Sequence, residues 1–300
     1  DPVAAPCPVE DVMRLAADSG LVRRVEAVVA LARQSVRLLP ADADPDSVAA
    51  PAGRSRFGGP PDLPEGVAWP RWRGAPLTFL AQVDLAEAAA AGLDPGTLPA
   101  RGLLLLFAAV DRAPSGRRPA DLGAGRALLV DGDAAAAAPP GDGPCLPTRA
   151  VPMALSREWV LPPADDPRVA ALGLDAGERA AWGRLRAALA DHQGVALETP
   201  DGDLHALHRL LGEPDDPRGE MPLTCELTAA GLDADDPAAA AEPFAARCRG
   251  RATRWRLLAQ LTIDDRLGWS FGAGRERLCL WVDARDLAAG ALDGVRAIAR

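Results

Sequence analysis

The sequence has little of the residue chemistry on which metal sites and many catalytic sites depend. It contains no lysine, asparagine or tyrosine, only three histidines, and five cysteines that are widely scattered. No two cysteines have the C-x-x-C spacing of a zinc knuckle, and their odd number does not indicate a disulfide framework. We therefore expect no metal, no cofactor and a reducing, cytoplasmic environment.

The chain also lacks an excess of positive charge, since 42 acidic residues outnumber 33 basic ones. The formal net charge is −9 at pH 7, whereas affinity for phosphate backbones and anionic membranes depends on clustered cations. No stretch reaches the roughly 18–20 uninterrupted apolar residues of a membrane span. These features predict that neither nucleic acid nor membrane is a partner. The opening DPVAAPCPVE lacks the layout of a signal peptide, although a chain that begins without methionine can have lost a targeting segment.

Apolar sequence is abundant, at 48% of 300 residues, which is enough for a core. Helical spacing of apolar residues predicts an N-terminal helical segment over residues 1–50, with helices at 9–20 and 21–34. The clearest helix is expected at 175–192, inside a helical insertion at about 165–195. A short helix is expected at 84–92, with Asp84 as its N-cap.

Four strands are expected between these helices, at 76–83, 102–110, 126–131 and 151–162. The segment 54–70 (RSRFGGPPDLPEGVAWP) is too rich in glycine and proline for a helix or a central strand. It predicts an ordered loop built from turns.

A repeat connects two distant parts of the chain. The chain has four glutamines, and two of them lie in similar stretches, LTFLAQVD around Gln82 and WRLLAQLT around Gln260. Each stretch is followed by a second apolar strand, which indicates an internal duplication. The sequence therefore predicts an α+β fold with mainly antiparallel sheets. Residues 51–300 are expected to form one domain of two pseudo-repeats, at about 51–150 and 201–300, with the helical insertion between them.

The two glutamines allow two interpretations, because a buried amide without a partner costs roughly 1–3 kcal/mol. In the first, each amide binds the backbone of a neighbouring loop, such as the glycine- and proline-rich segment, and stabilises the fold. In the second, the amides line a shared groove that binds a protein or a small polar ligand. The candidate ligand-binding residues in that case are Gln82, Gln260, Trp69, Arg56 and His208.

The order of several short motifs resembles the YwqG-like family, a bacterial family of unknown function. The motifs are SRFGGPPDLPEGVAWP, PLTFLAQVDL, HRLLGEP, WRLLAQLTID and LCLWVDARDL, and they span from about residue 54 to the C-terminal end. The resemblance implies an α+β fold with mainly antiparallel strands and an internal pseudo-duplication. It brings no established activity, cofactor or catalytic residue. Members of the family are similar in setting to proteins found near bacterial toxin systems, which implies an immunity-like role.

The first functional hypothesis is therefore a noncatalytic binding module. The alternative is a hydrolase or transferase of unfamiliar type, in which His208 and either Asp84 or Asp264 act as an acid/base pair. A scaffold protein with no pocket is a third possibility. The HALH stretch at 205–208 could place two histidines on one side of a helix, but no cysteine or carboxylate at a suitable spacing completes a metal site.

Overall fold

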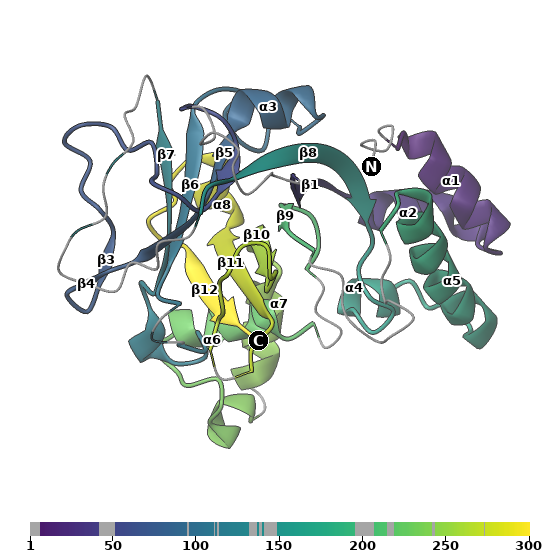
Figure 1. Ribbon diagram of the computed structural model, residues 1–300. Helices are drawn as coiled ribbons and strands as arrows, with labels where there is room; N and C mark the ends of the chain where they lie inside the picture. The colour runs from purple at the N-terminus through teal and green to yellow at the C-terminus, as the bar shows by residue number, and fades with distance from the viewer. Residues whose placement is uncertain are drawn as a thin grey trace.

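The computed structural model describes residues 7–41, 52–94, 96–110, 112, 114–131, 137, 140, 149–195, 207–214, 219–241, 244–272 and 274–300. In these residues one ten-stranded antiparallel sheet is flanked by helices (Figure 1). This confirms the predicted α+β class with mainly antiparallel strands. In the described residues no helix is both long enough and apolar enough to cross a membrane.

The strands of the sheet follow the order β12–β11–β10–β9–β1–β8–β2–β5–β6–β7. Their bounds are Arg33–Pro40 (β1), Arg56–Phe57 (β2), Thr78–Asp84 (β5), Leu103–Ala108 (β6), Gly125–Val130 (β7), Val151–Val160 (β8), Arg209–Leu210 (β9), Trp255–Thr262 (β10), Arg277–Asp283 (β11) and Arg296–Ala299 (β12). The strands β3 (Arg71–Trp72) and β4 (Ala75–Pro76) form a separate small hairpin. The four strands expected before residue 165 are thus present, each within two residues of its predicted bounds.

A helical cluster lies beside one end of β8 (Figure 1). It contains α1 (Val9–Asp18), α2 (Val25–Leu31), α4 (Pro167–Ala170) and α5 (Ala176–His192). Val12, Val28 and Trp182 are fully buried in its core. The predicted N-terminal helices and the inserted helix therefore pack against one another, because each is amphipathic and needs a partner for its apolar face.

The second N-terminal helix is shorter than predicted. It was expected to reach residue 34, but α2 ends at Leu31 and Arg33 begins β1. This strand pairs with β8 from Arg33 to Pro40 and with β9 on its other edge. Residues 33–40 thus lie in the middle of the sheet and not in a helix, because two neighbouring strands satisfy their backbone groups.

The remaining helices cover the sheet or connect its strands. They are α3 (Leu85–Ala90), α6 (Met221–Ala229), α7 (Phe244–Ala252) and α8 (Ala284–Ala288). Asp84 accepts a hydrogen bond from the backbone N–H of Ala86 and caps α3, as predicted. In the second half the corresponding short helix is α8, which follows β11 and not β10. Asp283 at the end of β11 provides its N-cap.

The two halves of the sheet have corresponding strands: β2, β5, β6 and β7 in one half match β9, β10, β11 and β12 in the other. The pairing of these strands matches as well. Arg56 of β2 lies opposite Gln82 of β5, and Arg209 of β9 lies opposite Gln260 of β10. The register of β5 shifts after Phe79, and that of β10 shifts after Leu257, which is the equivalent position. These matched registers extend the predicted repeat, while the proposed bounds of the two repeats stay a prediction.

The two outer strands of the sheet, β7 and β12, approach each other, so the sheet is nearly closed. A Cβ atom added to Gly125 of β7 would lie 2.6 Å from the Cβ atom of Ala297 in β12. The backbone N–H of Ala299 donates to the carbonyl oxygen of Ser115, at 3.1 Å. The exposed hydrogen-bonding edges that an open sheet would present are therefore largely covered.

Candidate functional site

Gln82 is fully buried and belongs to a polar network beneath the glycine- and proline-rich segment. Its Oε1 accepts from the backbone N–H of Asp62 at 3.0 Å, and its Nε2 donates to Asp62 Oδ2 at 2.8 Å. Nε2 also donates to the carbonyl oxygen of Arg54 at 3.1 Å. The amide therefore holds a loop in place, which is the structural interpretation of this residue.

Arg56 completes the same network. It is buried in β2, a two-residue strand inside the segment that the sequence predicted to be loop. Its guanidinium donates to both carboxylate oxygens of Asp62, at 3.1 and 2.9 Å. Burial acts to raise the pKa of Asp62, but hydrogen bonds from Arg56, Gln82 and Gly53 outweigh it and hold the pKa below its ordinary value. Asp62 is therefore ionised at neutral pH.

Gln260 is equally buried, on β10. Its Nε2 donates to the carbonyl oxygen of Leu207 at 3.1 Å, and the thiol of Cys279 lies 4.0 Å from its Oε1. Neither Gln82 nor Gln260 is among the residues that line the cleft beside β1 and α8 or the smaller one beside α5. Their contacts match the alternative in which each amide fixes a neighbouring segment.

His208 is close to a carboxylate, as the enzyme hypothesis requires, but it is closed off from solvent. Its Nδ1 accepts from the backbone N–H of Thr262, so the ring proton lies on Nε2, which faces Asp264 Oδ2 at 3.4 Å. Burial lowers the pKa of His208 below 6.5. Asp264 also accepts from Arg266 at 2.6 Å. The pair is thus a buried structural contact, whereas acid/base catalysis would require an open pocket.

Trp69, the remaining candidate binding residue, packs together with Trp72 and is held by a hydrogen bond. The indole N–H of Trp69 donates to the carbonyl oxygen of Leu77 at 2.8 Å, and its ring packs edge-on against Phe107. Trp72 is buried and donates to the carbonyl oxygen of Leu122 at 2.9 Å. Both residues belong with a satellite core beside the hairpin of β3 and β4.

One cluster of metal-ligating residues occurs in the described part of the chain. The thiol of Cys7, a carboxylate oxygen of Asp11 and a ring nitrogen of His192 lie within 4.8 Å of one another. Asp11 is already ion-paired with Arg14 and His192. Burial raises the pKa of Cys7, so the thiol stays protonated. Ion pairing and packing account for this cluster. The histidine pair of the HALH stretch, for which the sequence predicts no complete metal site, includes His205, which lies outside the described residues.

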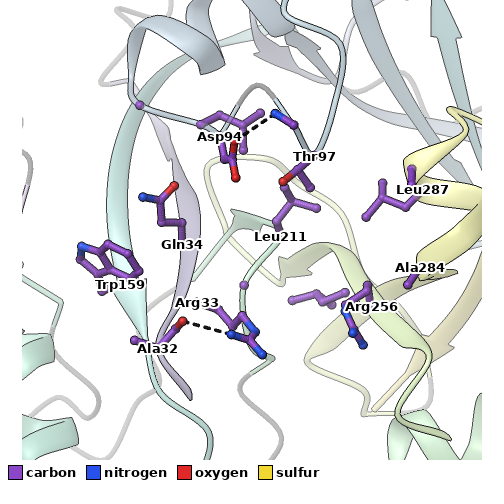
Figure 2. Close-up of a pocket in the computed structure, with 16 residues that line it drawn as sticks. Ala32, Arg33, Gln34, Asp94, Thr97, Trp159, Leu211, Arg256, Ala284 and Leu287 are labelled. Atoms are coloured by element: carbon purple, nitrogen blue, oxygen red, sulfur yellow. Dashed lines mark hydrogen bonds between the residues drawn. The ribbon is translucent and has the colours of Figure 1, made fainter. Parts of the chain in front are cut away.

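A cleft of about 730 Å³ opens elsewhere in the molecule. It is bounded by the first residues of β1, the segment after α3, the turn after β9, the start of β10 and α8 (Figure 2). Leu211, Leu257, Leu287 and Trp159 are among the large apolar residues that line it, and we call the three leucines its apolar floor. Its volume is in the range of small-molecule sites, which are mostly apolar with a few placed polar groups.

Arg33 and Arg256 supply positive charge to this cleft, and Asp94 supplies a negative one (Figure 2). None of the five candidate residues predicted from the sequence lines it. Sequence reasoning missed Arg33 because it was assigned to a helix. A signal for another part of the cleft was also missed. SRFGGPPD at 55–62 is similar to HRLLGEPD at 208–215, and this similarity would have indicated a short strand followed by a turn at Leu211.

Leu211 adopts an unusual backbone conformation at the floor of the cleft. Its φ is 61°, and the equivalent residue of the first half is a glycine, Gly58, with φ 59°. Both residues donate their backbone N–H to the matching strand, to Leu258 and Leu80 respectively. A left-handed conformation costs a leucine about 1–2 kcal/mol. The chain therefore retains a leucine here against a local preference for glycine, and non-glycine residues in such conformations cluster at functional sites.

The fold and the cleft define the class of the molecule: it is a mixed α+β protein with a nearly closed antiparallel sheet and a large cleft in its described part. The model of a family described as "Domain of unknown function (DUF1963)" matches residues 55–299. The chain belongs to this family. No curated protein matches the chain. The matched region contains all of the sheet except β1, which the N-terminal segment supplies.

Proposed function

We propose that the protein is a noncatalytic binding module that holds a small molecule in the cleft beside β1, β10 and α8. The observation that carries this proposal is the cleft itself, about 730 Å³ in volume, with an apolar floor and charged groups at its rim. The surroundings of Gln82 and Gln260 do not offer such a space, because both amides are buried and hydrogen-bonded.

The residues of the cleft support binding better than catalysis. Among the described residues that line it there is no histidine, cysteine or serine. Asp94 accepts a hydrogen bond from the backbone N–H of Gly96 at 2.9 Å, as a turn-forming aspartate does. Thr97 is the one hydroxyl-bearing residue among the described residues of the lining, and its hydrogen bond to Asp94 joins backbone groups, at 3.0 Å. Covalent and acid/base mechanisms need a nucleophilic side chain within hydrogen-bond reach of a base.

The finer assignments rest on the sequence motifs. The YwqG-like resemblance and an immunity-like role would both be compatible with a binding module, and the acidic net charge would suit a basic protein partner. A small ligand is the better proposal for this cleft, because the cleft is concave and presents two arginines.

The test fills the cleft without changing the rest of the surface. Ala288 lines the cleft, and its neighbour Ala289, also exposed, does not. We expect Ala288→Trp to abolish retention of small molecules from a metabolite extract of the source cells, while Ala289→Trp retains them as the unaltered protein does. Equilibrium dialysis followed by mass spectrometry of the retained compounds measures this.

Urea unfolding of both variants provides the control for folding. If no compound is retained by the unaltered protein, or if Ala288→Trp and Ala289→Trp retain the same compounds, the cleft is not the binding site and the proposal fails.

A further inference from the structure

Two arginines from different strands line the cleft. Leu210 of β9 pairs with Val36 of β1 on one side and with Ala259 of β10 on the other. Because β1 and β10 are both antiparallel to β9, they run in the same direction, and Arg33 and Arg256 lie near the first residue of each strand. A bulge in β10 offsets the two strands at this end, but both arginines line the same cleft (Figure 2). One ligand in the cleft can therefore contact both guanidinium groups.

Both guanidinium groups are held in place through one nitrogen. Nη1 of Arg33 donates to two backbone carbonyl oxygens of the preceding turn, at 3.1 and 3.4 Å. Nη1 of Arg256 donates in the same way to the carbonyl oxygens of Thr253 and Trp255. Neither arginine forms an ion pair within the described residues. Their other N–H groups can thus bind an anion, and the anchoring reduces the entropy that binding would cost.

The electrostatics of the cleft favour a negative group between these arginines. Burial lowers the pKa of Arg256, and the neighbouring charges of Arg33 and Arg168 lower it further. Arg168 is balanced by its ion pairs with Asp166 and Glu213. The charges of Glu213 and Asp283 act on Arg256 in the opposite direction but more weakly, so a net positive charge remains at the two arginines of the cleft. A bound anion would relieve their mutual repulsion.

The rest of the cleft limits where the ligand's charge can be. Asp94 lies away from the two guanidinium groups (Figure 2), where its carboxylate would repel a second negative group. Between the charged ends the floor is apolar, with Leu211 and Leu257 buried beneath it. A ligand with one charged end and an apolar body fits this distribution.

The first half of the sheet lacks these groups at its equivalent positions. Thr78 of β5 corresponds to Arg256, and Gly58 corresponds to Leu211. At each of these two positions the first half has a small neutral residue. The second half has a cation at one of them, Arg256, and a large apolar side chain at the other, Leu211. This difference is specific to the cleft, since the arginine–glutamine pairs of β2 with β5 and of β9 with β10 are the same in both halves.

We propose that the cleft binds a small amphipathic anion, with its carboxylate or phosphate between Arg33 and Arg256 and its apolar body on Leu211, Leu257 and Leu287. This inference rests on the proposed function, because it names the ligand class of the same cleft. Two anchored arginines recognise either anion, since both present oxygen pairs that match the guanidinium fork.

Calorimetric titration with three probes tests the ligand class. Octanoate carries a carboxylate, octyl phosphate carries a phosphate, and octanol has the same apolar body without charge. We expect at least one of the two anions to bind about tenfold or more tightly than octanol, and its affinity to fall as salt is added. The stronger of the two anions identifies the head group.

Substitution of the arginines tests the position of the anion. Arg33→Gln and Arg256→Gln should each weaken binding of that anion by about tenfold, since a charged hydrogen bond is lost. Arg23→Gln removes the same charge from an exposed arginine of the helical cluster and should leave the affinity unchanged.

The outcomes separate this inference from the proposed function. The inference is overturned if octanol binds as well as the anions, or if all three arginine variants behave alike. A neutral compound that is retained from the extract and lost in Ala288→Trp would then leave the proposed function standing. Failure of both experiments would overturn the two proposals together.

Discussion

At the scale of single residues, the buried polar side chains stabilise the fold by satisfying one another. Gln82, Arg56 and Asp62 form a closed set of hydrogen bonds, so each charge or amide is compensated away from water. Such networks stabilise a fold only when every member is satisfied, because an unpaired group in the interior loses its hydration without replacement. The loss of one member should therefore affect the others.

Gln82→Ala should lower the free energy of unfolding by about 2–4 kcal/mol, because it leaves the backbone N–H of Asp62 and the carbonyl oxygen of Arg54 without a partner. Gln34→Ala is the matched control, since Gln34 is partly exposed and makes no side-chain hydrogen bond within the described residues. Its cost should be below about 0.5 kcal/mol. Urea unfolding measures both. Equal costs would show that the network around Gln82 does not stabilise the fold.

His208 should make stability depend on pH. Folding lowers its pKa below 6.5, so the unfolded chain binds a proton more readily than the folded one below that pH. The contribution of neutral His208 to the free energy of unfolding is present above pH 6.5. It is lost as the pH falls, by up to about 1.4 kcal/mol per pH unit.

The measurement is urea unfolding between about pH 7.5 and 5.5. His208→Gln should reduce the slope of unfolding free energy against pH. A slope that is the same in the unaltered protein and in His208→Gln would mean that His208 does not stay neutral in the fold.

At the scale of single elements, α5 shows how local signals fix a helix. Asp175 accepts from the backbone N–H of Glu178, and Glu178 accepts from the backbone N–H of Asp175, which forms a capping box. Glu178 also accepts from Arg24 at 3.0 and 3.2 Å, which attaches the helix to the N-terminal segment. The strands differ, because β1 and β9 form only where neighbouring strands are available.

Asp175→Ala should destabilise the protein by about 1 kcal/mol, because the first turn of α5 loses its side-chain cap. The same substitution at the other end of this helix, Asp191→Ala, should be neutral or slightly stabilising, because a carboxylate near a helix C-terminus is unfavourable. Thermal unfolding compares the two variants. Destabilisation of the same size in both would show that the cap contributes nothing specific.

At the scale of the whole molecule, the ends of the sheet lie beside each other, and this arrangement depends on small residues. A Cβ atom on Gly116 would overlap the carbonyl oxygen of Ala297 in β12. Gly125 of β7 meets the same residue. The chain therefore keeps glycines where its first half approaches its last strand, and closure of the sheet requires them.

Gly116→Ala should be more destabilising than Gly53→Ala by about 1–3 kcal/mol. The two glycines have φ values of 75° and 74°, so both variants pay the same backbone strain. No atom lies within 4 Å of a Cβ at Gly53, in contrast to Gly116. The difference in urea unfolding free energy isolates the contact with β12. A difference near zero would mean that this contact yields without cost.

Much of the architecture could be predicted from local patterns. The helix that became α5 and the strands that became β5, β6, β7 and β8 all carry clear apolar periodicity and end at turn residues. The helices α6 and α7 and the strand β1 were not predicted, since their apolar patterns are short or ambiguous. None of the residues that line the candidate cleft was proposed as a binding residue from the sequence. The sequence did single out Gln82 and Gln260 as residues that need partners, but it could not show that the partners are backbone groups and Asp62.

The sequence by itself determined the helix caps, the strand periodicity and the need to satisfy two buried amides, because these depend on neighbours along the chain. Only the tertiary structure decided that residues 33–40 form a central strand and that Arg33 and Arg256 line one cleft. Those outcomes depend on pairing between segments more than 110 residues apart, and no local pattern records which strand lies beside which. The binding site that we propose arises at that pairing, where β1 and β10 lie on either side of β9.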